Sequence, residues 1–60
     1  MARHPLLDVP GAATHLGTSE RHVRRLVHER RIPYVKVGGK VRFRVEELER
    51  WLDANTVAAS

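Results

Sequence analysis

The sequence of 60 residues is long enough for one small domain, and a domain of this size has a thin hydrophobic core. It contains no cysteine, which excludes disulfides and cysteine-based zinc sites, and no apolar run of the roughly 18 residues that a transmembrane helix needs. The formal net charge of +4 and the pI of about 10.7 favour a polyanionic partner. No apolar segment follows the first five residues, so we expect no signal peptide and a cytoplasmic location.

The charges are distributed unevenly along the chain. Between Glu20 and Arg44 lie nine lysines and arginines against two glutamates, a net charge of +7. The remaining residues carry two arginines against five carboxylates, a net charge of −3, so the two parts together account for the total. In a protein selected only for solubility, positive and negative residues are distributed more evenly. This directional arrangement indicates that the middle of the chain contacts the polyanion.

A first helix is predicted from Asp8, which suits the N-cap position, to Gly17, which suits the left-handed residue beyond a helix C-terminus. Pro10 is tolerated because it falls in the first turn, where its missing N–H would have no intrahelical partner. The apolar residues of this segment recur at the spacing of one buried helical face. They are Val9, Ala12, Ala13 and Leu16.

A second helix follows almost at once, with Ser19 as its N-cap, and ends within residues 30–33 because Pro33 disfavours a helical residue before it. Its buried face holds Val23, Leu26 and Val27, and its opposite face holds Arg21, Arg25 and His28, with Arg24 on the flank. Two helices joined in this way, the second presenting arginines outward, form the helix-turn-helix pattern. The alternative is an ordinary helical hairpin with a charged face in solvent.

A β-hairpin is indicated by residues 34–37 and 41–44, which alternate apolar and polar side chains around Gly38-Gly39-Lys40. A two-residue loop would divide the apolar side chains between the two faces, whereas a three-residue loop keeps them on one face. The sequence therefore predicts a three-residue loop in which one glycine has a positive φ. The predicted apolar pairs are Val37 with Val41 and Val35 with Phe43.

The same register predicts Lys36 opposite Arg42 and Lys40 at the tip of the hairpin. Facing like charges destabilise a hairpin by itself, and a phosphate backbone would relieve the repulsion. This favours a wing that contacts nucleic acid. The alternative is an edge hairpin that carries lysine for solubility.

A third helix is predicted from about Val45 to Ala54, with Leu48, Trp51 and Leu52 on its apolar face. Because Trp51 lies on that face, we interpret it as a core residue rather than a stacking platform for bases. The fold class is then a small α+β winged helix-turn-helix, in the order helix, helix, hairpin, helix. We expect an N-terminal arm over residues 1–7, the DNA-binding domain over 8–54 and a flexible C-terminal tail over 55–60.

The order and spacing of several short motifs resemble the excisionase family, a branch of the winged helix-turn-helix proteins related to MerR-type regulators. The resemblance covers roughly residues 7 to 52, and Pro10-Gly11 departs from the acidic pair common at those positions. The motifs are Ala12-Ala13-x-x-Leu16-Gly17-Thr18-Ser19, Val23-x-x-Leu26-Val27, Arg30-Arg31-Ile32-Pro33-Tyr34-Val35-Lys36-Val37-Gly38, Val41-Arg42-Phe43 and Leu48-x-x-Trp51-Leu52.

The resemblance implies a recombination directionality factor in a bacterial host cell, which binds phage or plasmid attachment-site DNA, bends it and directs an integrase towards excision. It also implies cooperative binding at adjacent sites and a wing in the minor groove. The segregated charges favour head-to-tail association of adjacent copies on DNA. A small winged-helix transcriptional regulator is the nearest alternative role, and a protein-interaction module is the second, because the acidic third helix and the tail could dock an integrase or a polymerase.

The residues expected to contact double-stranded DNA come from two elements. From the recognition helix they are Thr18, Ser19, Glu20, Arg21, Arg24, Arg25 and His28, and from the wing they are Lys36, Gly38, Gly39, Lys40 and Arg42. We expect Arg21 to read a base, because N-terminal residues of a recognition helix enter the groove deepest, and Arg25 to bind either a base or a phosphate. We expect the hydroxyls of Thr18 and Ser19 to bind a phosphate, and Glu20 either to orient a neighbouring arginine or to accept a hydrogen bond from cytosine.

An enzyme is not expected, because the sequence offers no carboxylate pair, nucleophile arrangement or glycine-rich phosphate loop at an interpretable spacing. The four histidines provide no i, i+4 pair for a metal ion, so we expect no metal site and no cofactor. With few aromatic residues, the chain is also poorly suited to stacking on single-stranded nucleic acid.

Overall fold

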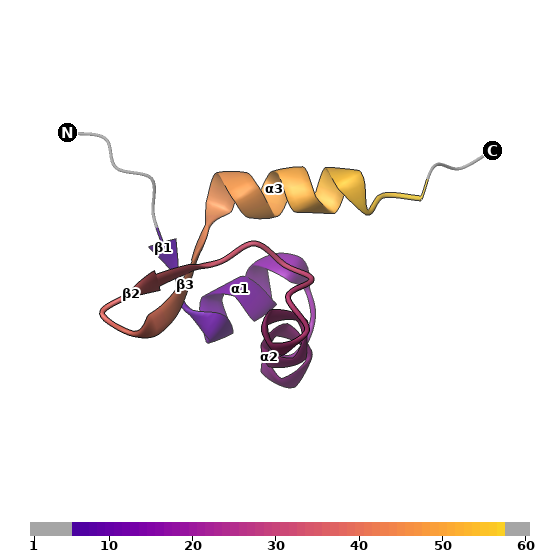
Figure 1. The fold of residues 1–60 in the computed structure, drawn as a ribbon. Coiled ribbons are helices and arrows are strands. Elements are labelled where there is room, and N and C mark those ends of the chain that lie inside the picture. The colour runs from indigo at the N-terminus through magenta and orange to yellow at the C-terminus, as the bar shows by residue number, and fades with distance from the viewer. Residues whose placement is uncertain (1–5, 58–60) are drawn as a thin grey trace.

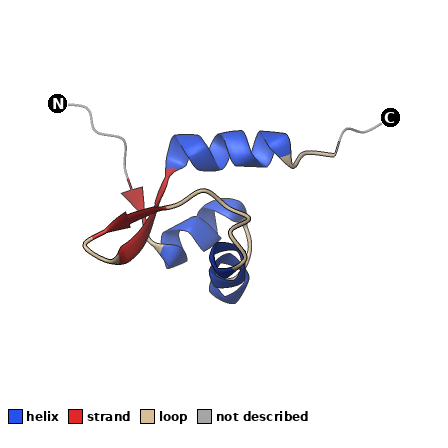
Figure 2. Cartoon of the chain, in the orientation of Figure 1, coloured by secondary structure: helices blue, strands red, loops and turns tan. Residues whose placement is uncertain are grey.

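The computed structural model describes residues 6–57, and within them the chain forms three helices and a three-stranded antiparallel sheet (Figures 1 and 2). The predicted small α+β winged helix-turn-helix is confirmed, with its helices and hairpin in the predicted order. Residues 1–5 of the expected arm and 58–60 of the expected tail lie outside the described residues. The elements are β1 (Leu6–Leu7), α1 (Val9–Leu16), α2 (Glu20–His28), β2 (Val35–Val37), β3 (Lys40–Arg44) and α3 (Val45–Ala54).

The ends of α1 and the start of α2 form where the capping residues predict them. Asp8 Oδ1 accepts a hydrogen bond of 2.8 Å from the backbone N–H of Gly11, and Ser19 Oγ accepts one of 3.1 Å from that of His22. Gly17 ends α1 in the left-handed conformation with φ of 70°. Because each cap satisfies a backbone group that the helix itself leaves unpaired, Asp8 fixes the start of α1, while Gly17 and Ser19 fix the short turn between the helices.

The C-terminus of α2 closes with the same hydrogen-bond pattern as that of α1, although no glycine is present. The N–H of Arg31 donates to the carbonyl of Leu26 at 2.9 Å, and the N–H of Arg30 donates to that of Val27 at 3.0 Å. This pattern requires a left-handed residue, and Arg30 adopts it with φ of 56°. The helix thus ends several residues before Pro33.

Strand β1 is not among the elements predicted from the sequence. Leu6 and Leu7 are expected in the N-terminal arm, but they pair antiparallel with β3, Leu6 opposite Arg44 and Leu7 opposite Phe43. Strand β3 is therefore the central strand of the order β1-β3-β2. Its neighbours cover different stretches of it, because β1 pairs with its end and β2 with its beginning.

The predicted three-residue hairpin loop is wrong. Strands β2 and β3 pair Val35 with Arg42, Lys36 with Val41 and Val37 with Lys40, which leaves a two-residue loop. Both loop residues, Gly38 and Gly39, have positive φ, 57° and 82°. A two-residue turn of this kind matches the right-handed twist of the strands, and consecutive glycines adopt it without steric strain. Turn chemistry thus prevails over the preference for gathering apolar side chains on one face.

The observed register also corrects the placement of the wing side chains. Lys36 lies opposite Val41 rather than Arg42, and Lys40 is the first residue of β3 rather than part of the loop. Because cross-strand partners share a face, Val35 and Val37 lie on the opposite face of the sheet from Phe43. The exposure agrees, since Val37 is 51% exposed and Phe43 is fully buried.

The core is formed by apolar residues of the three helices, of the inner face of β3 and of the loop after α2. Phe43 of β3, Val23 of α2 and Leu48 of α3 are fully buried. The remaining buried apolar residues are Ala12, Ala13, Leu26 and Ile32, and those packed against them include Leu7, Val9, Leu16, Val27, Tyr34, Val41 and Trp51. The apolar helical faces predicted from the sequence are thus the faces that form the core, except that Leu52 of α3 is half-buried and is not among these residues.

Helix α3 begins directly after β3 and is attached to the rest of the domain by polar contacts as well as by packing. The indole Nε1 of Trp51 donates a hydrogen bond of 2.7 Å to the carbonyl of Arg31, in the loop after α2. His15 Nε2 of α1 lies 2.6 Å from Glu49 Oε2 of α3. Trp51 packs against the core, as predicted.

Candidate nucleic-acid interface

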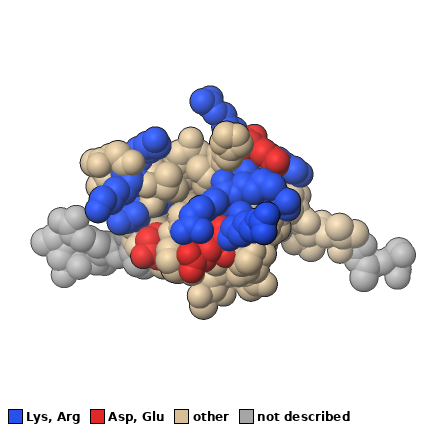
Figure 3. Space-filling model, turned by 90° about the horizontal axis from the view of Figure 1, so that it is seen from below, with Lys and Arg blue, Asp and Glu red and all other residues tan. Residues whose placement is uncertain are grey.

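Helix α2 presents a basic face on the side away from the core. Val23 and Leu26 are buried, whereas Arg21, Arg25 and His28 are exposed, as the 100° spacing of helical residues requires. Figure 3 views the molecule from the side on which α2 lies in Figure 1, and shows one group of Lys and Arg atoms over α2 and another over the β2–β3 hairpin. Both predicted elements therefore contribute to the same basic surface.

A surface hollow lies at the N-terminal part of this face. It is lined by Ser19, Arg21, His22 and Arg25. The structure thus brings together three residues of the predicted site and adds His22, which is not among the predicted contact residues. The signal for His22 is its place next to Arg21 and four residues after Thr18, a separation that puts two side chains on one side of a helical turn.

The hydroxyl groups before α2 are engaged within the chain. Ser19 Oγ accepts the capping hydrogen bond from the N–H of His22, which leaves its own proton available to a ligand. Thr18 Oγ1 lies 2.8 Å from Nδ1 of the His22 ring, in a partly buried position. The two hydroxyls predicted to bind phosphate therefore differ, because that of Thr18 is occupied by a side chain.

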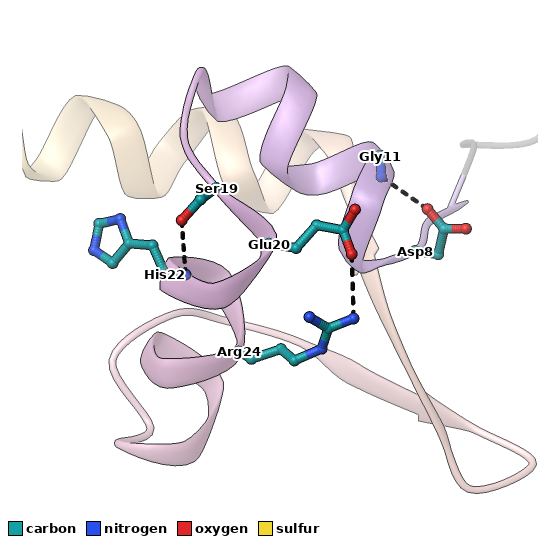
Figure 4. A network of polar contacts seen from close by, with 6 residues as sticks. All are labelled: Asp8, Gly11, Ser19, Glu20, His22 and Arg24. Atoms are coloured by element: carbon teal, nitrogen blue, oxygen red, sulfur yellow. Dashed lines mark hydrogen bonds and ion pairs between the residues drawn. The ribbon is translucent and has the colours of Figure 1, made fainter.

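The opposite flank of α2 carries an ion pair. Glu20 Oε1 lies 3.2 Å from a guanidinium nitrogen of Arg24, one turn along the helix, and both side chains are exposed (Figure 4). In Figure 4 the His22 ring points away from this pair. An exposed pair of this kind contributes little stability, about 0.3–0.5 kcal/mol, but it holds Arg24 along the edge of the basic face.

The wing residues do not share one face of the hairpin. Lys40 and Arg42 lie on the outer face with Val35 and Val37, while Lys36 lies on the other face. The guanidinium of Arg42 is half-buried and donates a hydrogen bond of 2.7 Å to the carbonyl of Val41. At the tip, Gly38 and Gly39 carry no side chains, and a Cβ at either would meet no atom within 4 Å.

Two further arginines are paired with carboxylates. Arg31 lies 3.5 Å from Glu29, and Arg44 lies 3.5 Å from Glu47 at the start of α3. All four side chains have substantial exposure, so these pairs are screened by solvent and salt.

The described part of the chain, residues 6–57, has no helix long and apolar enough to span a bilayer. Within the same residues no three potential metal-ligating side chains form a group. Buried side-chain nitrogen and oxygen atoms there all have hydrogen-bond partners, so nothing in the core points to a missing ligand.

The chain also shows a sequence relationship that covers nearly all of this fold. The family model described as a helix-turn-helix domain matches residues 6–56, from the start of β1 to two residues beyond α3. Comparisons with curated proteins and with solved structures gave no match. In this fold the second helix enters the major groove of duplex DNA and the first crosses the backbone. The chain therefore belongs to the helix-turn-helix domain family, and this membership indicates that it binds double-stranded DNA.

Proposed function

We propose that the protein binds duplex DNA sequence-specifically as an excisionase, which bends attachment-site DNA and directs an integrase towards excision of a prophage or other element. The observation that carries the DNA-binding part is the exposed face of α2. Arg21, Arg25 and His28 lie opposite the buried Val23 and Leu26, on a helix whose N-terminus is exposed. A helix with this arrangement can enter the major groove without disturbing the core.

Within the proposed interface, Arg21 reads a base and Arg25 contacts either a base or a phosphate. An arginine fork can donate to O6 and N7 of guanine, and such a pair contributes about 1–3 kcal/mol of discrimination between bases. Arg24 and His28 contact the DNA backbone. The ion pair with Arg24 supports an orienting role for Glu20, which otherwise accepts from cytosine.

The hairpin contacts the groove beside α2 with its tip. Lys36 and Lys40 lie on opposite faces of the hairpin, so a wing inserted tip first presents one lysine to each wall of the groove. The side-chain-free tip of Gly38 and Gly39 allows close approach of the backbone to DNA. Arg42 adds its charge to that of Lys40 on the outer face.

The excision role is supported by the resemblance of residues 7 to 52 to the excisionase family. We further propose that adjacent copies associate head to tail on DNA, with the acidic α3 of one copy against the basic surface of the next. In α3, Glu47 and Glu49 are engaged with Arg44 and His15 of their own chain. The surface offered to a neighbour is therefore less acidic than the sequence alone indicates.

Duplex binding is tested first by its dependence on salt. If about five phosphates are neutralised, the logarithm of the binding constant falls with the logarithm of salt concentration with a slope of about −4 to −5. An affinity independent of salt would exclude the proposed DNA-binding surface.

Substitutions then separate base contacts from phosphate contacts. We expect Arg21→Ala to relax base preference, and Lys36→Ala and Lys40→Ala to weaken binding evenly across sequences, each reducing the salt slope by about 1. Because the two lysines lie on opposite faces, loss with only one of them would show a hairpin lying flat on the DNA. Equal losses for Arg21→Ala on specific and random duplexes would contradict base reading.

Footprinting on DNA flanking the encoding gene distinguishes the biological roles. Protection within an attachment site supports excision, whereas protection over a promoter supports a transcriptional regulator. A probe with several sites tests cooperativity, because independent binding of each copy would contradict head-to-tail association. Partner capture that survives nuclease treatment, together with no affinity for duplex DNA, would support a protein-interaction module.

A further inference from the structure

His22 makes a side-chain contact within the protein, and the proposed DNA interface gives this residue no role. Its Nδ1 atom lies 2.8 Å from the hydroxyl oxygen of Thr18, in a partly buried position. The ring also lines the hollow that Arg21 and Arg25 share at the start of α2. A histidine that lines the same hollow as two arginines is close to an anion bound in that hollow.

The contact with Thr18 determines what the other ring nitrogen offers. In a neutral imidazole one nitrogen donates and the other accepts, and the partner of one nitrogen sets the role of the other. When the threonine hydroxyl donates to Nδ1, the proton of the ring is on Nε2, which then becomes a donor. Within residues 6–57, the hydrogen bonds of the His22 ring involve Nδ1 alone.

The position of His22 on the helix indicates which part of the DNA this donor meets. At 100° per residue, His22 lies about a quarter turn from the centre of the face formed by Arg21, Arg25 and His28. Side chains at the centre of such a face meet base edges, and those on its flank meet the sugar–phosphate backbone. Glu20 and Arg24 occupy the other flank, and Figure 4 shows the His22 ring directed away from them.

We propose that His22 Nε2–H donates a hydrogen bond to a DNA phosphate, and that Thr18 acts as its positioning residue by fixing the tautomer and the orientation of the ring. The inference rests on the proposed duplex binding and adds a contact to it. It also changes the role of Thr18, because a hydroxyl that donates to Nδ1 has no proton left for a phosphate. The phosphate contact from this turn then comes from His22, beside the hydroxyl of Ser19.

The first test uses the free protein, so its outcome does not depend on DNA binding. Nitrogen-15 chemical shifts of the imidazole, measured by NMR above the titration range, distinguish the two neutral tautomers. We expect His22 to carry its proton on Nε2 and to lose this preference in Thr18→Val, which removes the hydroxyl and keeps the branched shape. A proton on Nδ1 in the wild-type protein would overturn the proposal.

The second test measures affinity for the footprinted duplex and for a random duplex of equal length. We expect His22→Leu to weaken binding by about 10-fold on both, as for a lost hydrogen bond to a charged acceptor. His22→Gln places an amide N–H near the position of Nε2, so it should lose less affinity than His22→Leu. His15→Gln, on α1 and paired with Glu49, is the matched control and should bind as the wild type does.

The outcomes separate this inference from the proposed function. Failure of the wild-type protein to bind any duplex would refute duplex binding itself. Wild-type binding with an unchanged affinity in His22→Leu would refute only the phosphate contact. Loss on the specific duplex alone would assign His22 to a base edge instead. Circular dichroism of each variant confirms that it is folded. If Thr18→Val still weakened DNA binding in the His22→Gln background, Thr18 would not act through His22, and the positioning role would be overturned.

Discussion

The C-termini of α1 and α2 lead to a prediction about stability, because they share one backbone motif but place different residues at its left-handed position. The left-handed position is Gly17 with φ of 70° after α1 and Arg30 with φ of 56° after α2. Both are closed by a hydrogen bond from the following N–H, Thr18 to Ala13 and Arg31 to Leu26, each at 2.9 Å. An L-residue in this conformation carries steric strain between Cβ and the carbonyl oxygen, and glycine does not.

The magnitude follows from two opposing terms. The left-handed conformation of Arg30 destabilises the folded state by about 1–2 kcal/mol, and glycine would remove this strain. Glycine would also stabilise the unfolded chain by about 0.4–1 kcal/mol, because it has more conformational freedom there. Arg30→Gly should therefore raise the free energy of unfolding by about 0.5–1 kcal/mol, and Gly17→Ala should lower it by a similar amount. Beyond Gly17 and its neighbours in the chain, no heavy atom lies within 4 Å of a Cβ built there, so the effect is conformational and not a clash with the surrounding structure.

Urea denaturation followed by the fluorescence of Trp51, the one tryptophan of the chain, measures both changes. With a slope of about 1 kcal/mol per molar urea, the midpoints should move by about 0.5–1 M in opposite directions. Arg30→Ala is the control, because it removes the guanidinium and keeps the Cβ. A midpoint for Arg30→Gly no higher than that for Arg30→Ala would refute the assignment of strain to this residue.

Further substitutions test the turn, the attachment of α3 and the core. At the hairpin tip, Gly39→Ala should lower the free energy of unfolding by about 1 kcal/mol, whereas Gly38→Asn should be tolerated because Asn-Gly suits the same turn; chemical denaturation compares the two. Trp51→Phe removes the 2.7 Å hydrogen bond to Arg31, so the melting temperature by circular dichroism should fall, by about 4–8 °C per kcal/mol lost. Phe43→Ala should cost about 3–5 kcal/mol, enough to abolish the dispersed NMR spectrum of so small a domain, while Phe43→Leu should retain it.

The helices were predictable from the sequence because their signals are local. Asp8, Ser19 and Gly17 act on backbone groups within a few residues, so the caps can be recognised without knowledge of tertiary contacts. The C-terminus of α2 is harder to predict, because Arg30 adopts a left-handed conformation that glycine usually occupies.

The sheet was less predictable because its signals conflict or are short. Apolar alternation favours a three-residue loop, while the pair Gly38-Gly39 favours a two-residue turn, and the local turn geometry decides the register. Strand β1 has only two residues, too few for an alternating pattern, and it forms because β3 offers it an edge. His22 was missed because its role depends on the Thr18 side chain and on the hollow beside it, which exist only in the folded chain.

The loop between α2 and β2 connects the two elements that we propose to contact DNA, and Arg31 anchors that loop through its backbone. Its N–H closes the end of α2 on the carbonyl of Leu26, and its own carbonyl accepts the hydrogen bond from Trp51. Because both backbone groups of Arg31 are hydrogen-bonded, the position of α3 constrains the loop that leads into β2. Helix α3 therefore helps to set the angle between α2 and the hairpin, although it is part of neither element. Because α2 and the hairpin must fit the DNA at the same time, that angle has to be fixed.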